Sequence, residues 1–299
     1  DAIIFRNTDD RHTDSLIAAV NRGVPVRILQ EPETYRTTTY FRHSMNIDRM
    51  YMAGAQVKSR AHLGLTHEKL VLLYSKGMAI FGSSNMSVPS SDSQDEHNYF
   101  TQKPTIFQEL VTHFDRKWNS TSEYKPFTPL PPDEPVSPSP TNGGFTSSPN
   151  VTLQWEGGFW AWKYDVYFGT TSNPPLLTAN LNTGFPGPGT PETYQLPTLQ
   201  PGTTYFWRIV GKTMANMSAS SPVWSFTVPG SGTPPSAPTG LTATPASTST
   251  INLTWSNVAD ELGYRIERSQ NGSSGWQDIG STQADVNSFQ DQGLAAGTT

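Results

Sequence analysis

Two short apolar runs with a turn-like break between them constrain the fold of this chain more than any other feature. The runs are Leu70–Leu73 and Met78–Phe81, and the break is Ser75–Gly77. Apolar runs of this length, bounded by turn residues, are typical of strands buried in a sheet. The spacing therefore predicts two adjacent strands that form a hairpin inside a well-buried sheet.

Four polar side chains flank the predicted hairpin. His67 and Lys69 open the first run, and Ser83 and Asn85 follow the second. Residues two apart in a strand share a face, so His67 and Lys69 should point the same way. Three of these groups can donate to an anion, and the fourth can act as nucleophile or base, which suits a phosphate. Either fragment alone is more often structural, as a satisfied histidine or a plain turn.

The spacing of these residues resembles a known motif. His67-x-Lys69, followed by Gly82-Ser83-x-Asn85, is similar to the HKD motif of the phospholipase D superfamily. The one departure is Tyr74, which stands where the motif has an aspartate. In the family that aspartate is mostly a structural hydrogen-bonding residue. The resemblance covers about residues 1–119.

The resemblance implies a double displacement at phosphorus that requires no metal and no cofactor. His67 would be the nucleophile that forms a phosphohistidine, or the acid/base partner of that nucleophile. Lys69, Ser83 and Asn85 would bind the phosphate oxygens. Glu96, which lies downstream of the hairpin, would hydrogen-bond the other His67 nitrogen and fix its tautomer.

The remaining histidines have no comparable pattern. His97 lies in the next predicted strand, where alternation sends it away from the site, so we expect a structural role. His62 is expected in a loop, and His113 on the last helix is expected to pack or face solvent. His12 and His43 have no partner that the sequence reveals.

The first 125 residues alternate apolar strands with helices. This β-α-β-α-β order is typical of an α/β sandwich. We expect Thr13 or Asp14 to cap the first helix and Gly54 to end the second. The expected strands are at 3–5, 24–29, 56–58 and 97–101, in addition to the hairpin, and the expected helices are near 13–22, 40–53 and 105–118.

The rest of the chain has a different organisation. Residues 126–135 are rich in proline and predict an extended, semi-rigid linker. In the repeat that follows, Val151–Trp155 aligns with Ile251–Trp255, and a Tyr lies nine residues after each Trp. The pattern resembles fibronectin type III, a β-sandwich with a core Trp and a tyrosine corner. We expect one module at 136–231 and a truncated one at 234–299.

A complete site in the superfamily needs two HKD motifs, and this sequence has one His-x-Lys. The chain begins at Asp1–Phe5, which reads as the middle of a strand. It stops at Leu294–Thr299, which matches Leu199–Thr204 of the first repeat. We therefore expect the second motif in a missing N-terminal half, with a dimer mate as the alternative source.

The amino-acid composition limits the kinds of ligand and partner that the chain can bind. Residues 1–128 hold 15 Lys and Arg against 14 Asp and Glu, so their net charge is near +1. Such a balance does not favour nonspecific binding of nucleic acid. The chain has no cysteine, which excludes disulfides and thiolate metal sites. Charged residues are 15% of the chain, against a usual ~25%, and Ser, Thr, Pro and Gly replace them, as is common in extracellular modular proteins.

These observations predict a multidomain protein, with an α/β phospholipase D-like sandwich followed by all-β fibronectin type III sandwiches. We expect a secreted bacterial phosphodiester hydrolase, without a signal peptide in this segment, that acts on phospholipids. The type III modules would be spacers or would bind a polymer or a cell surface. Two alternatives stay open: an HKD-type nuclease on DNA or RNA, and a non-catalytic adhesion or binding protein with a degenerate HKD domain.

Overall fold

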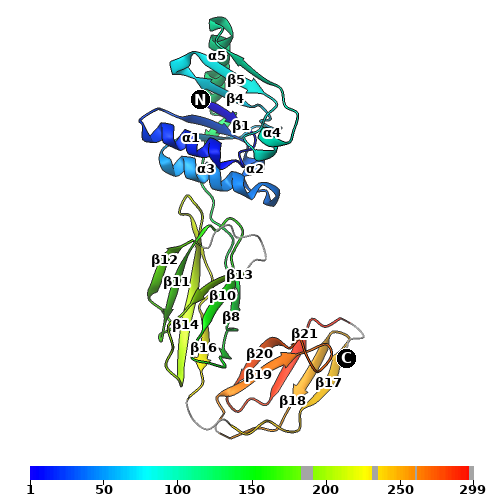
Figure 1. Ribbon diagram of the computed structural model, residues 1–299. Coiled ribbons are helices and arrows are strands. Elements are labelled where there is room, and N and C mark those ends of the chain that lie inside the picture. The colour runs from blue at the N-terminus through cyan, green and yellow to red at the C-terminus, as the bar shows by residue number, and fades with distance from the viewer. Residues whose placement is uncertain (183–190, 231–234, 260, 296–299) are drawn as a thin grey trace. The chain divides into compact units, whose positions relative to one another are not determined.

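The first domain is built on one mixed sheet of seven strands in the order β6-β5-β4-β1-β2-β3-β7 (Figure 1). In the computed structural model, which describes residues 1–182, 191–230, 235–259 and 261–295, β1, β2 and β3 pair in parallel. The other neighbours in the sheet are antiparallel. The strands are β1 (Ala2–Ile4), β2 (Arg27–Gln30), β3 (Gln56–Arg60), β4 (Leu70–Leu73), β5 (Met78–Gly82), β6 (Asn98–Thr101) and β7 (Tyr124–Pro126).

Helices connect the parallel strands in the predicted β-α-β-α-β order. The first of them begins earlier than expected, because Asp9 caps it by accepting from the Arg11 N–H at 3.0 Å. The prediction that Thr13 or Asp14 is the cap was therefore wrong. The second long helix ends at Gly54, as expected, with a φ of 105° that favours glycine. The helices are α1 (Asp10–Asn21), α2 (Pro32–Tyr35), η1 (Thr38–Tyr40), α3 (Phe41–Ala53), η2 (Tyr74–Lys76), α4 (Val88–Asp92) and α5 (Pro104–Asn119).

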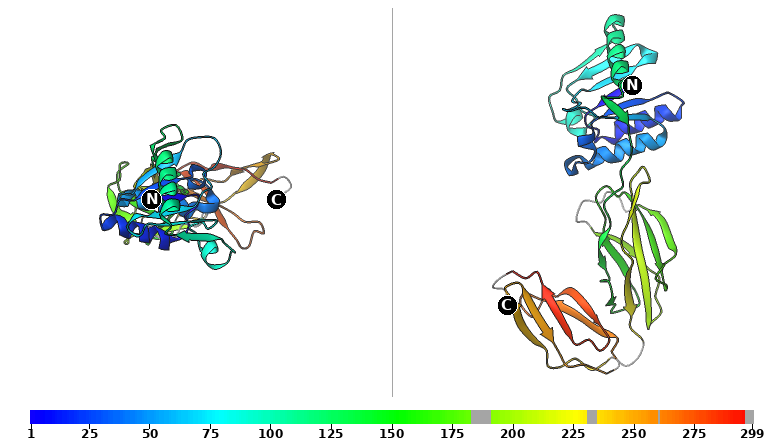
Figure 2. Two further views of the ribbon diagram at one scale, coloured as in Figure 1. Left: turned by 90° about the horizontal axis from the view of Figure 1, so that it is seen from above. Right: turned by 180° about the vertical axis from the view of Figure 1, so that it is seen from behind.

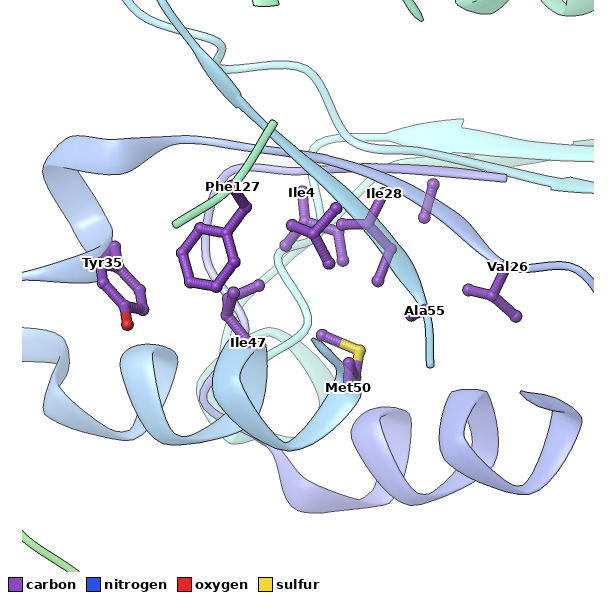
Figure 3. Packing of buried hydrophobic residues seen from close by; sticks show 10 residues of the cluster. Ile4, Val26, Ile28, Tyr35, Ile47, Met50, Ala55 and Phe127 are labelled. Carbon is purple, nitrogen blue, oxygen red and sulfur yellow. The ribbon is translucent and has the colours of Figure 1, made fainter. Parts of the chain in front are cut away.

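The sheet separates two apolar layers because successive strand residues point to opposite faces. Ile4 belongs to the cluster under α1 and α3, with Ile28, Ile47 and Met50 (Figure 3). Ile3 belongs to the cluster that α5 covers. The second cluster consists of Ile3, Leu29, Leu70, Leu72, Ala79, Val111, Phe114 and Tyr124. Both faces are therefore buried, as the apolar runs in the sequence indicate.

The predicted hairpin is confirmed. β4 and β5 pair antiparallel with Leu70 opposite Phe81, and η2 connects them. Gly77 completes the connection with a φ of 54°. Pro126, which the sequence predicts as the first linker residue, is instead the last residue of β7, opposite Lys58.

The strands after residue 135 form two pairs of sheets. The first pair has the orders β13-β10-β8 and β12-β11-β14-β16-β9, and the second has β17-β18-β21 and β19-β20. Figure 2 shows the two strand-rich segments, the first in green to yellow and the second in orange to red. Further along the first segment, β15 pairs with β14. The strands are β8 (Val136–Ser139), β9 (Gly144–Phe145), β10 (Thr152–Glu156), β11 (Lys163–Gly169), β12 (Leu176–Leu181), β13 (Pro191–Gln195), β14 (Thr203–Lys212), β15 (Ser218–Ser220), β16 (Trp224–Val228), β17 (Thr242–Ser247), β18 (Thr250–Thr254), β19 (Gly263–Arg268), β20 (Gln277–Gln283) and β21 (Ser288–Gln292).

The repeated Trp and Tyr have the same role in both segments. Trp155 is fully buried against the edge of Tyr164, with ring centroids 5.5 Å apart. Trp255 contacts Tyr264 in the same way at 5.1 Å. The predicted tyrosine corner of the first repeat is present, because the Tyr205 hydroxyl accepts from the N–H of Gln200 at 3.0 Å. The end of the second repeat, 296–299, and the predicted boundaries at 231 and 234 lie outside the described residues.

No helix among the described residues is long and apolar enough to cross a membrane.

Candidate active site

His67 and Lys69 lie together in the segment that leads into β4. The Lys69 Nζ is 3.0 Å from His67 Nδ1, 3.2 Å from Nε2 and 2.7 Å from the His67 carbonyl oxygen. Both side chains lie against Phe5, which follows β1. The His67 and Phe5 ring centroids are 4.4 Å apart, and Lys69 Nζ is 5.0 Å from the Phe5 ring centroid. The structure thus brings the two central residues of the motif into contact.

Glu68 holds this segment from the other side. Its carboxylate lies 3.0 Å from His113 Nε2 and 3.1 Å from Lys117 Nζ, both on α5. Residues on either side of Glu68 in an extended chain point away from it. The contact with α5 therefore helps to keep His67 and Lys69 on the opposite side. It also gives His113, which the sequence left as packing or surface, a defined partner.

Ser83 and Glu96 bind each other rather than His67. The Ser83 hydroxyl donates to Glu96 Oε2 and accepts from the His97 N–H at 3.0 Å. The Ser83 N–H donates to the His97 carbonyl at 3.0 Å. Among the described residues no hydrogen bond joins Glu96 to the His67 ring, so the orienting role of Glu96 stays a prediction.

Asn85 follows the end of β5 and is half-buried. Its N–H donates to Ser90 Oγ at 3.3 Å, and its side-chain Oδ1 is buried without a hydrogen-bond partner. No hydrogen bond in the described part of the chain links the Asn85 side chain to His67 or Lys69. The unsatisfied atom is an acceptor, so a bond to a phosphate oxygen would have to come from the Asn85 amide nitrogen Nδ2. The phosphate-binding roles of Ser83 and Asn85 stay predictions.

Charge in the site favours a neutral imidazole and attracts an anion. Burial, and then the Lys69 ammonium, lower the pKa of His67. Burial also lowers the pKa of Lys69; Glu96 opposes this shift and the Arg6 guanidinium adds to it. Hydrogen bonds from Ser83 are the first cause that lowers the pKa of Glu96, so this carboxyl is ionised near neutral pH. The pattern matches the requirements of a nucleophilic histidine beside a phosphate.

Arg6 is a site residue that the sequence analysis missed. It follows β1, and its Nη2 donates to Ser87 Oγ at 3.3 Å. Its Nε is buried without a hydrogen-bond partner, and its guanidinium lies 4.7 Å from the centre of the Tyr40 ring. No motif marks a single Arg in this position. The available signal was its place at the end of a strand that neighbours β4 in the sheet.

A buried ion pair anchors the chain segment that precedes His67. Glu31, fully buried at the end of β2, accepts from both Arg60 Nε and Nη2 at 2.8 Å. The same carboxylate accepts from the N–H of Thr66 at 2.8 Å. The Thr66 hydroxyl lies 2.8 Å from the hydroxyl of Tyr124 in β7. Thr66 directly precedes His67, so these contacts hold the backbone from which the His67 side chain extends.

The Glu31→Gln variant should therefore lower the free energy of unfolding by roughly 3 kcal/mol. This value is at the low end for breaking a buried pair, because Glu33 also contacts Arg60. Burial opposes ionisation of Glu31, but bonds from Arg60 and backbone N–H groups keep its pKa below the ordinary value. The pair therefore stabilises the folded state at any pH above the ordinary pKa of a glutamate. This stabilisation is lost as the pH falls through the lower pKa that Glu31 has in the folded state. Denaturant unfolding at pH 7 and at pH 4 measures both effects.

The matched control is Glu33→Gln, because Glu33 contacts the same Arg60 at 2.8 Å but is 66% exposed. An exposed pair of this kind contributes at most ~1 kcal/mol. Equal losses in the two variants would show that burial of Glu31 does not decide its contribution.

Tyr74, which stands where the motif has an aspartate, takes part in a hydrogen-bond network around Arg27. Its hydroxyl donates to the Asp1 carboxylate and lies 3.3 Å from Arg27 Nη2. Arg27 also donates to Asp1 Oδ1 and to Asp115 Oδ1, each at 2.8 Å. The carboxylates for Arg27 thus come from Asp1 and Asp115, and Tyr74 completes the network as a hydrogen-bonding residue.

The remaining histidines lie outside this cluster. His43 is fully buried, its Nδ1 accepts from the Asn7 N–H at 2.8 Å, and burial lowers its pKa to about 3. His12 is 4.0 Å from Asp9, and His62 Nδ1 is 2.7 Å from the Leu63 carbonyl. In the described ranges no group of three or more His, Cys, Asp or Glu side chains could hold a metal ion.

Comparison with protein families shows which family the first domain resembles. Residues 2–118 match the model of a family described as cardiolipin synthase, PLD-like domain. This segment is a phospholipase D-like domain. The matched residues include His67, Lys69, Ser83, Asn85 and Glu96. No curated protein matches the chain.

Solved structures with similar folds include two that match the phospholipase D-like domain. A phospholipase D family member, Nuc from Salmonella typhimurium, has 17% identity and a TM-score of 0.36, over 42% of this chain and 79% of Nuc. NucT from Helicobacter pylori has 14% identity and a TM-score of 0.36, over 42% of this chain and 80% of NucT.

The strand-rich remainder resembles fibronectin domains. The FN1–FN3 domains of chicken CNTN1 match with 18% identity and a TM-score of 0.29. That match covers 58% of this chain and 61% of the CNTN1 structure.

Proposed function

We propose that the phospholipase D-like domain is a phosphodiesterase whose nucleophile is His67. The observation that carries this proposal is the contact between the Lys69 ammonium and the His67 ring, at 3.0 and 3.2 Å from its two nitrogens. A cation in that position stabilises the phosphoryl oxygens and disfavours protonation of the nucleophile. Both effects assist attack on phosphorus.

In the proposed reaction a His67 nitrogen forms a bond to phosphorus while the bond from phosphorus to the leaving oxygen breaks. A second histidine donates a proton to that leaving oxygen. Water then attacks the phosphohistidine, the P–N bond breaks, and the second histidine takes the proton from water. Lys69 and the Asn85 amide would bind the phosphoryl oxygens in both steps.

The second histidine would come from another HKD motif in the complete protein or from a second copy of the chain. None of the other histidines in the described residues lies in contact with His67. We propose that the type III modules act as spacers or anchors and that the protein works outside the cell.

We propose phospholipids as the substrates. The loop that ends at His67 has two exposed leucines, since Leu63 is 98% and Leu65 is 51% exposed. Apolar side chains beside a phosphodiester site suit a substrate with hydrocarbon chains. Nucleic acid is the second candidate, because the Arg6 guanidinium adds positive charge next to Lys69.

The substrate assay compares release of alcohol from a choline-type phospholipid with release of nucleotides from DNA, each in EDTA. We expect alcohol release from the lipid to be the faster reaction, and we expect it to persist in EDTA because Lys69 and Asn85 supply the neutralising groups. Faster cleavage of DNA would favour the nuclease. Hydrolysis of neither substrate by the complete protein would favour a non-catalytic binding domain, and activity that EDTA abolishes would contradict the phosphohistidine mechanism.

A further inference from the structure

A cavity with two arginines in its wall includes Arg6, the residue that follows Phe5. Its volume is about 250 Å³, which is room for roughly eight waters at ~30 Å³ each. Segments after β1, around the start of α3 and in α4 enclose it. The lining residues are Arg6, Thr8, Thr39, Tyr40, Phe41, Arg42 and Pro89.

Arg6 connects this cavity to the catalytic cluster. Its guanidinium lines the cavity, and its charge also acts on Lys69 and Glu96. The Met86 N–H donates to the Arg6 carbonyl at 3.1 Å, which holds Arg6 alongside the segment that follows Asn85. Arg6 is therefore shared between the wall of the cavity and the segment that carries the proposed phosphate-binding residues.

The chemistry of the walls selects an anion. Arg6 Nε is buried without a hydrogen-bond partner, which is costly for a charged donor unless a ligand accepts from it. The second guanidinium, Arg42, is held at the wall by an ion pair with Asp10 at 2.9 Å. Thr8 and Thr39 add hydroxyl groups. Guanidinium forks and hydroxyls together are typical of phosphate recognition.

We propose that this cavity binds a second phosphate of the substrate, one sugar or glycerol unit away from the scissile phosphate. The proposal rests on the proposed phosphodiesterase function and adds the substrate class, a phosphodiester that carries a neighbouring phosphate. A nucleic acid chain and a glycerophospholipid with a phosphorylated head group both have this chemistry. The cavity would align such a substrate with His67.

Calorimetric titration of the wild-type chain with mono- and bisphosphates tests the proposal without turnover. Thymidine 3′,5′-bisphosphate is compared with thymidine 3′-monophosphate, and glycerol 1,3-bisphosphate with glycerol 3-phosphate. We expect at least one bisphosphate to bind about tenfold or more tightly than its monophosphate, since each charged hydrogen bond contributes at least that factor. The pair with the larger ratio identifies the sugar or the glycerol as the spacer.

Arg42→Gln and Arg6→Gln should each bring that ratio close to one, while Arg42→Gln leaves the affinity for the monophosphate within about threefold. Arg49→Gln is the control. Arg49 is also on α3, but it does not line the cavity, and its Nη2 lies 2.5 Å from Asp14 Oδ1. Circular dichroism checks that the variants are folded.

Bisphosphates that bind no more tightly than monophosphates, or a ratio that both Arg variants leave unchanged, would overturn the second phosphate site. A wild-type protein that shows the binding ratio but hydrolyses no phosphodiester would instead overturn the proposed function, so the two failures are distinguishable.

Discussion

His67→Ala should lower kcat for phosphodiester hydrolysis by at least ~10⁴-fold, since loss of a nucleophile removes the covalent route altogether. Only His67 has a lysine two residues on, and only its ring contacts that ammonium in the described structure. Single-turnover kinetics on a soluble chromogenic phosphodiester, with the complete protein, measures the effect without the complication of product release.

His97→Ala is the matched control for this substitution. His97 lies near the same loop, but it contacts Ser83 through its backbone N–H and carbonyl, which alanine retains. We expect kcat to stay within about threefold of the wild type. A similar collapse in both variants would mean that the loop, rather than the imidazole of His67, is what the reaction requires.

Lys69→Met should lower kcat/KM by roughly 10²- to 10³-fold, because one preorganised charge on the phosphoryl oxygens is lost. It should also change the pH dependence. Lys69 is the second cause, after burial, that lowers the pKa of His67, so the wild-type acid limb should lie below the ordinary histidine value of about 6.5. Without the ammonium, the acid limb of kcat/KM should move to higher pH.

The profile of kcat/KM between pH 4 and 8 measures both effects of Lys69. Lys76→Met is the control, because Lys76 is an exposed residue of the turn between β4 and β5. An acid limb that stays in place in Lys69→Met would show that burial alone sets the pKa of His67. A loss below tenfold would remove Lys69 from the catalytic groups.

The sequence predicted the hairpin and the contact between His67 and Lys69 because both depend on local rules. Short apolar runs and a glycine turn specify β4 and β5, and the two-residue spacing specifies the shared side. The Trp and Tyr pairs of the two later segments were predictable for the same reason, since a repeated spacing buries the same residues twice.

The parts that were missed depend on residues far apart in the sequence. Arg6 reaches the site only because β1 and β4 are neighbours in the sheet. The buried Glu31 joins Arg60 and Thr66 through the edge where β2 and β3 end. Glu96 was expected to bond the His67 ring, but its carboxylate accepts from the Ser83 hydroxyl instead. Sequence spacing alone does not rank such competitors.

Tyr74 belongs to a network that a motif comparison does not reveal. A tyrosine in place of an aspartate suggests a degenerate site, yet the network around Arg27 is complete with Asp1 and Asp115 as its carboxylates. In this chain Tyr74 is a hydrogen-bonding residue of that network.

Trapping the covalent intermediate tests the central claim most directly. The complete protein is mixed with a phosphodiester labelled at phosphorus, quenched in alkali within milliseconds to seconds, digested and analysed for the labelled peptide. The account predicts an acid-labile phosphoryl group on His67, formed within one turnover and absent in His67→Ala. Turnover without a phosphohistidine, or a phosphoryl group on a residue other than His67, would contradict it.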